Sequence, residues 1–298
     1  MIYSVPIDKT IKEIDIISNI NTEIGAIHIK SDQGIHFTGE MPEDIYPLVY
    51  SGESGAIKWH GHIIEKNAIE AKGNDNSVDA LILGQTDVRF LLVKKSQIYE
   101  YLKNNMNQEL QQFQLARSYQ LDENSLEIFQ SIHNRILKKE QIPNDELMPL
   151  LLQLTKNPII REPASKNNFD LTQKAIRLMK EHLKSPITIS ELSNLLKVNI
   201  RTLELIFNKH FNLSPKSYYK RLLYLAIEEE LRKRNPEEKT ISDILETYQI
   251  YDLSSFGKYF KDYFELKPSE IGFNNEKVNP LGWNEKIFSS FLGEDNLN

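Results

Sequence analysis

The chain has 298 residues, 40% of them hydrophobic and 26% charged, with a formal net charge of −6 and no cysteine. These values are typical of a globular protein long enough for two domains, and they exclude disordered and fibrous classes. Without cysteine, the chain forms no disulfide, no thiolate metal site and no cysteine nucleophile. It has no run of about 18 apolar residues and no signal-like N-terminal pattern, which predicts a cytoplasmic protein outside the membrane.

The N-terminal part reads as β-structure. Short segments rich in Ile, Val and aromatic residues are separated by turn sequences rich in Gly, Asn and Asp, as at residues 51–55 and 73–77. This spacing is typical of a sandwich or a small barrel, and we expect a β-barrel within residues 1–95. The clearest strand segments are Ile24–Ile29, Ala56–His60, Ala80–Leu83 and Val88–Val93.

Helical periodicity follows within residues 96–156 and predicts three helices. The first starts near Ile98, the second runs to Leu137 with Asp122 as its cap, and the third covers Glu146–Thr155. Two roles stay open for these helices: a dimer contact, or a cover over the open side of the barrel. Residues 161–169 carry a proline and turn-forming residues, which predict a linker after a sensor and dimerisation domain at 1–160.

The C-terminal part contains a duplicated stretch. Ile200–Pro215 returns as Leu253–Pro268, shifted by 53 residues, so that Phe207 corresponds to Phe260 and Pro215 to Pro268. Each copy places apolar residues at i, i+3, i+4 and i+8, which predicts an amphipathic helix. These core positions are Leu203, Ile206, Phe207 and Phe211 in the first copy and Phe256, Tyr259, Phe260 and Phe264 in the second.

Cap signals divide each copy into a short helix, a turn and a second helix. Asn199 and Asp252 stand just before the second helices as N-caps, again 53 residues apart. Capping boxes at Thr188–Glu191 and Thr240–Asp243 open the preceding short helices, and Asp170 with Gln173 opens the first helix of the domain. The pattern predicts two helix-turn-helix motifs, whose second helices enter the DNA major groove in proteins that read DNA.

A continuous helix from Pro215 to about Arg234 connects the two motifs. About 20 residues at 1.5 Å each span roughly 30 Å, close to the ~34 Å between successive major-groove faces on one side of B-DNA. One polypeptide can therefore place both second helices in adjacent groove segments.

These residues resemble the AraC/XylS family of bacterial transcription regulators. Arg201 to Leu203, Phe207, Leu213 to Pro215 and Tyr218 look like the family's first motif; Ser254, Phe256, Phe260, Phe264 and Pro268 to Glu270 look like its second. The resemblance covers about residues 169–273. It implies a cupin-like sensor barrel that binds a small-molecule effector, a DNA-binding domain at 170–273, a homodimer, and RNA polymerase as a partner.

The chain departs from the family pattern at six positions. Asn212 and Glu265 stand where a glycine usually follows the second helix, and Lys197 and Gln249 replace turn glycines. Asn tolerates the left-handed conformation better than Glu does. Arginines that are common in the family are replaced by Leu205 and Leu223.

The polar residues of the two second helices that are not assigned to the apolar core, together with Leu205 and Leu253, are the ones that we expect to face DNA. Arg201 suits a bidentate contact to guanine, Glu204 accepts from cytosine, and Leu205 or Leu253 suits a thymine methyl group. Lys216 and Lys220 are expected at phosphates, with Lys209, Lys258 and Lys261. The full predicted DNA-binding set is Arg201, Thr202, Glu204, Leu205, Asn208, Lys209, Leu253, Ser254, Ser255, Lys258 and Lys261.

The charge divides unevenly along the chain. Residues 169–273 hold 17 Lys and Arg against 15 Asp and Glu, and the remainder holds 19 against 27. The predicted DNA-binding part is thus only mildly basic, which favours salt-dependent binding through local clusters.

The main rival is a metal-dependent cupin enzyme with a helical appendage. His60 and His62 are expected on one face of a strand with Glu65 nearby, as in a metal-binding motif, whereas His28 and His36 are expected at the surface or in turns. A second rival is a helical adaptor that binds protein. No catalytic constellation, metal or cofactor is predicted, and residues 274–298 are a tail with no assigned role. The preferred hypothesis is an α+β, non-enzymatic, sequence-specific transcription regulator.

Overall fold

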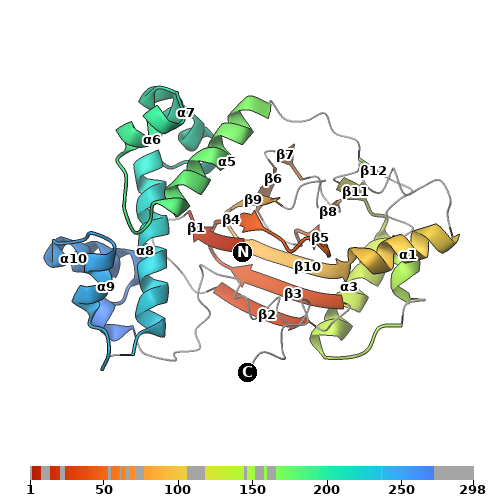
Figure 1. The fold of residues 1–298 in the computed structure, drawn as a ribbon. Helices are drawn as coiled ribbons and strands as arrows, with labels where there is room; N and C mark the ends of the chain where they lie inside the picture. Colours follow the sequence, from red (N-terminus) through yellow and green to blue (C-terminus); the bar gives the residue numbers. More distant parts are fainter. Residues whose placement is uncertain are drawn as a thin grey trace.

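The structure is a computed structural model that describes residues 2–7, 14–20, 24–52, 55–60, 62–64, 68–71, 77–105, 118–143, 146–151, 158–159, 166–235 and 237–271. A β-rich N-terminal part lies beside an all-helical C-terminal part, as Figure 1 shows. The fold class is α+β, as predicted. No helix in the described ranges combines the length and the apolar character that a bilayer crossing requires.

The N-terminal part contains two antiparallel sheets. The smaller has the strand order β1-β4-β9-β6-β7 and the larger the order β12-β11-β8-β5-β10-β3-β2. The smaller sheet is formed by β1 (Ile2–Pro6), β4 (Ile35–Glu40), β9 (Ser77–Leu83), β6 (Ala56–Trp59) and β7 (His62–Ile63). The larger is formed by β12 (Pro158–Ile159), β11 (Ser118–Gln120), β8 (Ala68–Ala71), β5 (Ile45–Tyr50), β10 (Thr86–Lys94), β3 (Ile24–Ser31) and β2 (Ile14–Ile20).

The two sheets face each other across an apolar core. Phe37 of β4 pairs with Ala80 of β9, Phe90 of β10 pairs with Val49 of β5, and the Phe37 and Phe90 rings meet edge to face at 6.4 Å. No strand pairing joins the edges of one sheet to those of the other within the described residues, so the predicted closed barrel is wrong there. Side-chain packing holds the sheets together as a sandwich, the other architecture that the strand spacing predicts.

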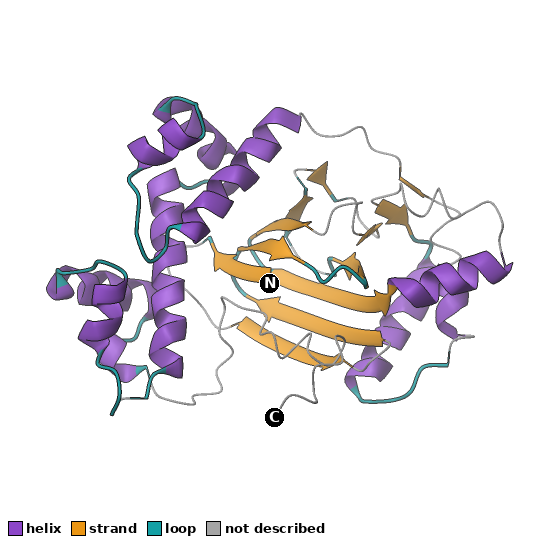
Figure 2. Cartoon of the chain, viewed as in Figure 1, coloured by secondary structure: helices purple, strands orange, loops and turns teal. Residues whose placement is uncertain are grey.

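Helices cover the outer face of the larger sheet (Figure 2). They are α1 (Lys95–Asn105), α3 (Glu123–Leu137) and a helical stretch at residues 146–151. Phe129 and Ile132 of α3 share a buried cluster with Leu48 and Leu91 of the sheet. Asp122 caps α3 by accepting from the Ser125 N–H, as predicted. Helix α3 therefore covers a face of the larger sheet rather than the open side of a barrel, and a dimer role stays a prediction.

The C-terminal part is built from helices within the described residues 166–235 and 237–271. Its elements are α5 (Lys166–Glu181), α6 (Ile189–Leu195), α7 (Ile200–Phe211), α8 (Pro215–Lys233), α9 (Ile241–Thr247), α10 (Leu253–Phe264) and the 3-10 turn η1 (Pro268–Glu270). Helix α5 begins at Lys166 rather than at Asp170, so the cap predicted for Asp170 and Gln173 is wrong. Gln173 instead donates to Asp79 of the smaller sheet. Residues 161–165 of the predicted linker and the tail at 274–298 lie outside the described residues.

Two histidines expected at the surface or in turns are placed differently. His36 is fully buried, and His28 is largely buried and hydrogen-bonded to Asp87 at 2.9 Å. Both histidines lie within strands, and the elements that pack against those strands determine how exposed their side chains are. Their partners are distant in the sequence, which is why local context did not reveal them.

Candidate nucleic-acid interface

Two similar helix pairs, α6–α7 and α9–α10, pack against the long helix α8 (Figure 1). Phe207 and Phe211 of α7 lie against Tyr218 near the start of α8, with ring centroids 5.5 and 4.8 Å apart. Phe256 and Phe260 of α10 lie against Tyr224, further along α8, at 5.3 and 6.3 Å. Because all these rings belong to one buried cluster, α8 holds both pairs on a common core.

The predicted caps are confirmed in both pairs. Asn199 accepts from the Thr202 N–H at 2.7 Å, and Asp252 accepts from the Ser255 N–H at 3.0 Å. The capping boxes of α6 and α9 are formed by Thr188 with Glu191 and by Thr240 with Asp243. These bonds satisfy amide groups that would otherwise be unpaired at the helix starts.

The four positions that lack the family's glycine are all left-handed. The φ angles are +55° at Lys197, +53° at Asn212, +57° at Gln249 and +59° at Glu265. Glycine adopts this region without cost, whereas other residues are strained there, Asn less than most. The backbone geometry of the glycine pattern is thus retained although the glycines are absent.

The base-facing candidates of α7 lie on its open side. Arg201, Glu204, Leu205 and Asn208 are exposed, and Leu205 is 63% exposed although it is apolar. Thr202 is half-buried, and its hydroxyl donates to Asn199 Oδ1 at 2.9 Å. Thr202 therefore has a structural role in the cap, in addition to the contact predicted for it.

The second helix presents a similar open side. The exposed candidates are Leu253, Ser254, Ser255, Lys258 and Lys261. Tyr251, which the sequence analysis missed, is 75% exposed in the turn before α10. The sequence does indicate this exposure, because Tyr251 stands next to the Asp252 cap and outside the apolar stripe of α10.

One core assignment in α10 is wrong. Tyr259 is 49% exposed, and Lys220 Nζ lies 3.4 Å from the centroid of its ring. The buried position belongs to Tyr263, whose ring lies 6.3 Å from that of Tyr224. The buried stripe of α10 therefore includes Tyr263 at i+7 from Phe256, and not Tyr259 at i+3. This shift arises because α10 packs on both α8 and the N-terminal part.

The helical part also carries exposed lysines. Lys209, Lys216, Lys258 and Lys261 are exposed. Lys220 is half-buried, and burial together with the neighbouring charge of Lys216 lowers its pKa. Its position over the Tyr259 ring makes it a contact between α8 and α10 as well as a predicted phosphate contact.

The rival metal motif does not have the expected geometry. His60 lies in the turn between β6 and β7 with a φ of +46°, and not within a strand as expected. No group of three or more His, Asp or Glu side chains suited to a metal is present among the described residues, which do not include Glu65.

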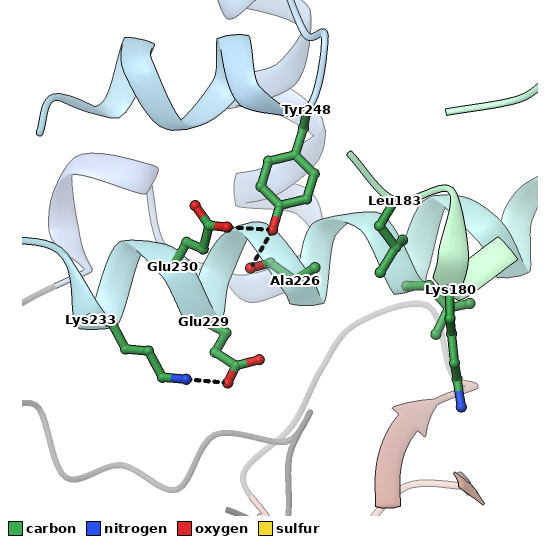
Figure 3. Close-up of a pocket in the computed structure, with 8 residues that line it drawn as sticks. Lys180, Leu183, Ala226, Glu229, Glu230, Lys233 and Tyr248 are labelled. Carbon is green, nitrogen blue, oxygen red and sulfur yellow. Dashed lines mark hydrogen bonds and ion pairs between the residues drawn. The ribbon is translucent and has the colours of Figure 1, made fainter. Parts of the chain in front are cut away.

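A pocket of about 240 Å³ lies beside α8, between α5 and α9 (Figure 3). Its acidic groups are paired: Glu229 with Lys233 at 2.7 Å, and Glu230 with the Tyr248 hydroxyl at 3.0 Å. The ammonium group of Lys180 points away from these pairs, and burial lowers its pKa to about 7 against the opposing effect of Asp79. The pocket therefore offers apolar walls and no unpaired acidic group.

Comparison with known proteins gives a family match in the helical part and matches to known relatives. A family model described as a helix-turn-helix domain matches residues 192–272. The chain is 24% identical over 120 residues to XylDLEGF operon transcriptional activator 1 of Pseudomonas putida, covering 40% of this chain and 36% of that protein. It is 29% identical over 113 residues to HTH-type transcriptional regulator GbdR of Pseudomonas aeruginosa, covering 37% of this chain and 28% of that protein. The chain thus matches only about a third of the length of these relatives.

Two solved structures are similar over more of the chain but at low scores. Unsaturated fatty acid bound ToxT from Vibrio cholerae is 13% identical with a TM-score of 0.32, covering 88% of this chain and 96% of that one. The AraC-like transcriptional activator CuxR is 8% identical with a TM-score of 0.36, covering 73% and 81%. TM-scores of this size do not establish a shared fold.

Proposed function

We propose that the whole chain is a sequence-specific DNA-binding transcription regulator of the AraC/XylS type, because residues 192–272 match a helix-turn-helix family model and the chain is similar to known transcription regulators. The observation that carries the proposal is the pair of capped units on one helix, each with an open polar side. Helix α8, which connects the two units, has 19 residues and is thus about 28 Å long, a length of the same order as the ~34 Å between successive groove faces of a duplex.

Helices α7 and α10, the two recognition helices, offer contacts both to the bases and to the phosphate backbone. Arg201 and Glu204 offer hydrogen bonds to base edges, and Leu205 offers an apolar surface for a thymine methyl group. Ser254 and Ser255 at the start of α10 offer small hydroxyls to bases or phosphates. The exposed lysines Lys209, Lys216, Lys258 and Lys261 supply the salt-dependent phosphate contacts.

Selection of bound duplexes from a random pool tests this division. Arg201→Ala is expected to cost about 1–3 kcal/mol on the selected site and to relax preference at one base pair. Lys261→Ala is the matched comparison, since it removes an exposed positive charge from the other helix; it should weaken all sequences alike and reduce the salt dependence. Unchanged affinity and preference in Arg201→Ala would refute the assignment of that residue.

The remaining parts of the proposal rest on the resemblance to the family. We assign residues 1–160 to sensing and dimerisation and residues 170–273 to DNA binding, with a cytoplasmic location. A small-molecule effector bound in the N-terminal part would change the populations of DNA-competent states, and RNA polymerase would be the partner at the promoter. Selection with and without candidate metabolites, followed by sedimentation of the complex, tests the effector and the dimer together.

A further inference from the structure

The N-terminal part contributes to the core of the DNA-binding domain. Val5, Ile7 and Leu81 belong to the same buried cluster as Phe207 and Tyr218. Strand β1 lies against α8, as Figure 1 also shows. The two parts therefore meet through buried side chains on specific elements.

The first anchor in this contact is a buried hydrogen-bonded chain. His36 on β4 lies 2.7 Å from the Tyr218 hydroxyl on α8 and 2.6 Å from Asp79 on β9. Gln173 on α5 donates to the same Asp79 carboxylate at 2.7 Å. The His36 ring also packs 4.7 Å from the ring of Phe211, the last residue of α7. A side chain of the sheet thus completes the aromatic core of the first helix-turn-helix unit.

The charge state of Asp79 sets the direction of these bonds. Burial by itself would raise the pKa of Asp79, but the charge and hydrogen bond of His36, with His60 and Gln173, lower it. An ionised carboxylate only accepts, so His36 Nε2 carries a proton and donates to Asp79. The Nδ1 atom of the same ring is the hydrogen-bond partner of the Tyr218 hydroxyl. Every member of the chain has a partner in this arrangement.

The second anchor is the carbonyl oxygen of Pro6 at the end of β1. It accepts from Arg221 Nη1 on α8 at 2.6 Å and from the Tyr263 hydroxyl on α10 at 3.4 Å. The Arg221 guanidinium also lies 5.4 Å from the centroid of the Tyr263 ring. This anchor joins the N-terminal part to the second unit.

The two anchors therefore restrain both helix-turn-helix units against one body. Ten of the eleven predicted DNA-binding residues are exposed in this docked arrangement and Thr202 is half-buried, so docking does not cover the open sides. A surface that is already held in its bound geometry loses less conformational entropy when it binds, so binding is tighter.

We propose that His36 and Tyr218 are positioning residues, which hold the N-terminal part on the DNA-binding domain. In this arrangement the recognition helices α7 and α10 engage two adjacent segments of one DNA site, its half-sites, together. This inference rests on the proposed function and deepens it, because it assigns the docked arrangement to the DNA-binding state.

Tyr218→Phe tests the first anchor, since it removes only the hydroxyl and keeps the ring against Phe207 and Phe211. Tyr219→Phe is the matched control: it removes a hydroxyl from the next residue of α8, whose acceptor is the His182 carbonyl oxygen within the helical part. Affinities are measured on a selected duplex and on the same duplex with one half-site scrambled. Tyr218→Phe should lose roughly tenfold on the intact duplex, the factor expected when one partner of a buried hydrogen bond is left unpaired, and less than about twofold on the scrambled one.

The control should show no such difference between the duplexes. Equal losses on both duplexes, no loss, or a gain of affinity in Tyr218→Phe would each overturn the proposal. Tyr263→Phe removes the longer hydrogen bond to Pro6 and should lose less affinity, again on the intact duplex more than on the scrambled one. This variant tests the proposal if Tyr218→Phe does not fold. If the unaltered protein selects no duplex at all, the proposed function itself fails, which is a separate result.

Discussion

Replacement of Glu265 by glycine should stabilise the helical part. Glu265 ends α10 with φ +59° and ψ +6°, and its N–H donates to the Lys261 carbonyl oxygen at 2.8 Å. The left-handed conformation costs a residue with a Cβ about 1–2 kcal/mol. Glycine avoids that cost but loses about 0.4–1 kcal/mol through the greater freedom of its unfolded chain. The net expectation for Glu265→Gly is a gain of about 0.5–1 kcal/mol.

The assay is urea unfolding followed by circular dichroism at 222 nm, a band that reports helix. Glu265→Gln is the matched control: it removes the carboxylate from the helix C-terminus, where negative charge is unfavourable, but keeps the strained backbone. Asn212→Gly tests the same geometry at the first unit and should gain less, because Asn tolerates the left-handed region. A loss of stability in Glu265→Gly, or a gain no larger than that of Glu265→Gln, would refute the reasoning.

Other predictions concern the aromatic core and the response to pH. Phe260→Ala removes a fully buried ring and should cost about 3–5 kcal/mol in unfolding free energy, whereas Tyr259→Ala, at a half-exposed neighbour, should cost about 1 kcal/mol or less; similar losses would contradict the assigned packing. Burial lowers the pKa of His133 to about 4, against the opposing effect of its hydrogen bond to the Ile27 carbonyl oxygen. Between pH 6.5 and 4 the unfolded chain therefore binds a proton that the folded chain does not, and stability falls as the pH falls through this window. Thermal unfolding at pH 7 and pH 5 should show that His133→Gln loses about 2 kcal/mol less than the unaltered protein; equal losses would exclude this origin.

The helical part was predictable because local rules govern it. The caps at Asn199 and Asp252, the capping boxes and the buried stripe of α7 all follow from residues within a few positions of one another. The start of α5 was not predictable from its cap signal, because the side chain of Gln173 is engaged by Asp79, 94 residues earlier in the sequence. The exchange of Tyr259 for Tyr263 has a similar cause, since the partner of Tyr263 is Pro6.

The N-terminal part was less predictable. Its four clearest strands were found, but β4 and β5 were not named, although β5 is buried along its whole length. Alternation between apolar and polar residues is weak in a strand that is covered on both faces, so β5 has no period-two signal. The role of His36 depends on Tyr218, 182 residues later, and no local pattern encodes that contact.

The account depends most on the claim that one chain reads two groove segments on the same side of a duplex. Hydroxyl-radical footprinting of a selected duplex measures this directly, with Phe260→Ala as the comparison. We expect two protected segments about 10 base pairs apart on one face, of which Phe260→Ala loses one. A single protected segment with the unaltered protein, or two on opposite faces, would contradict the claim.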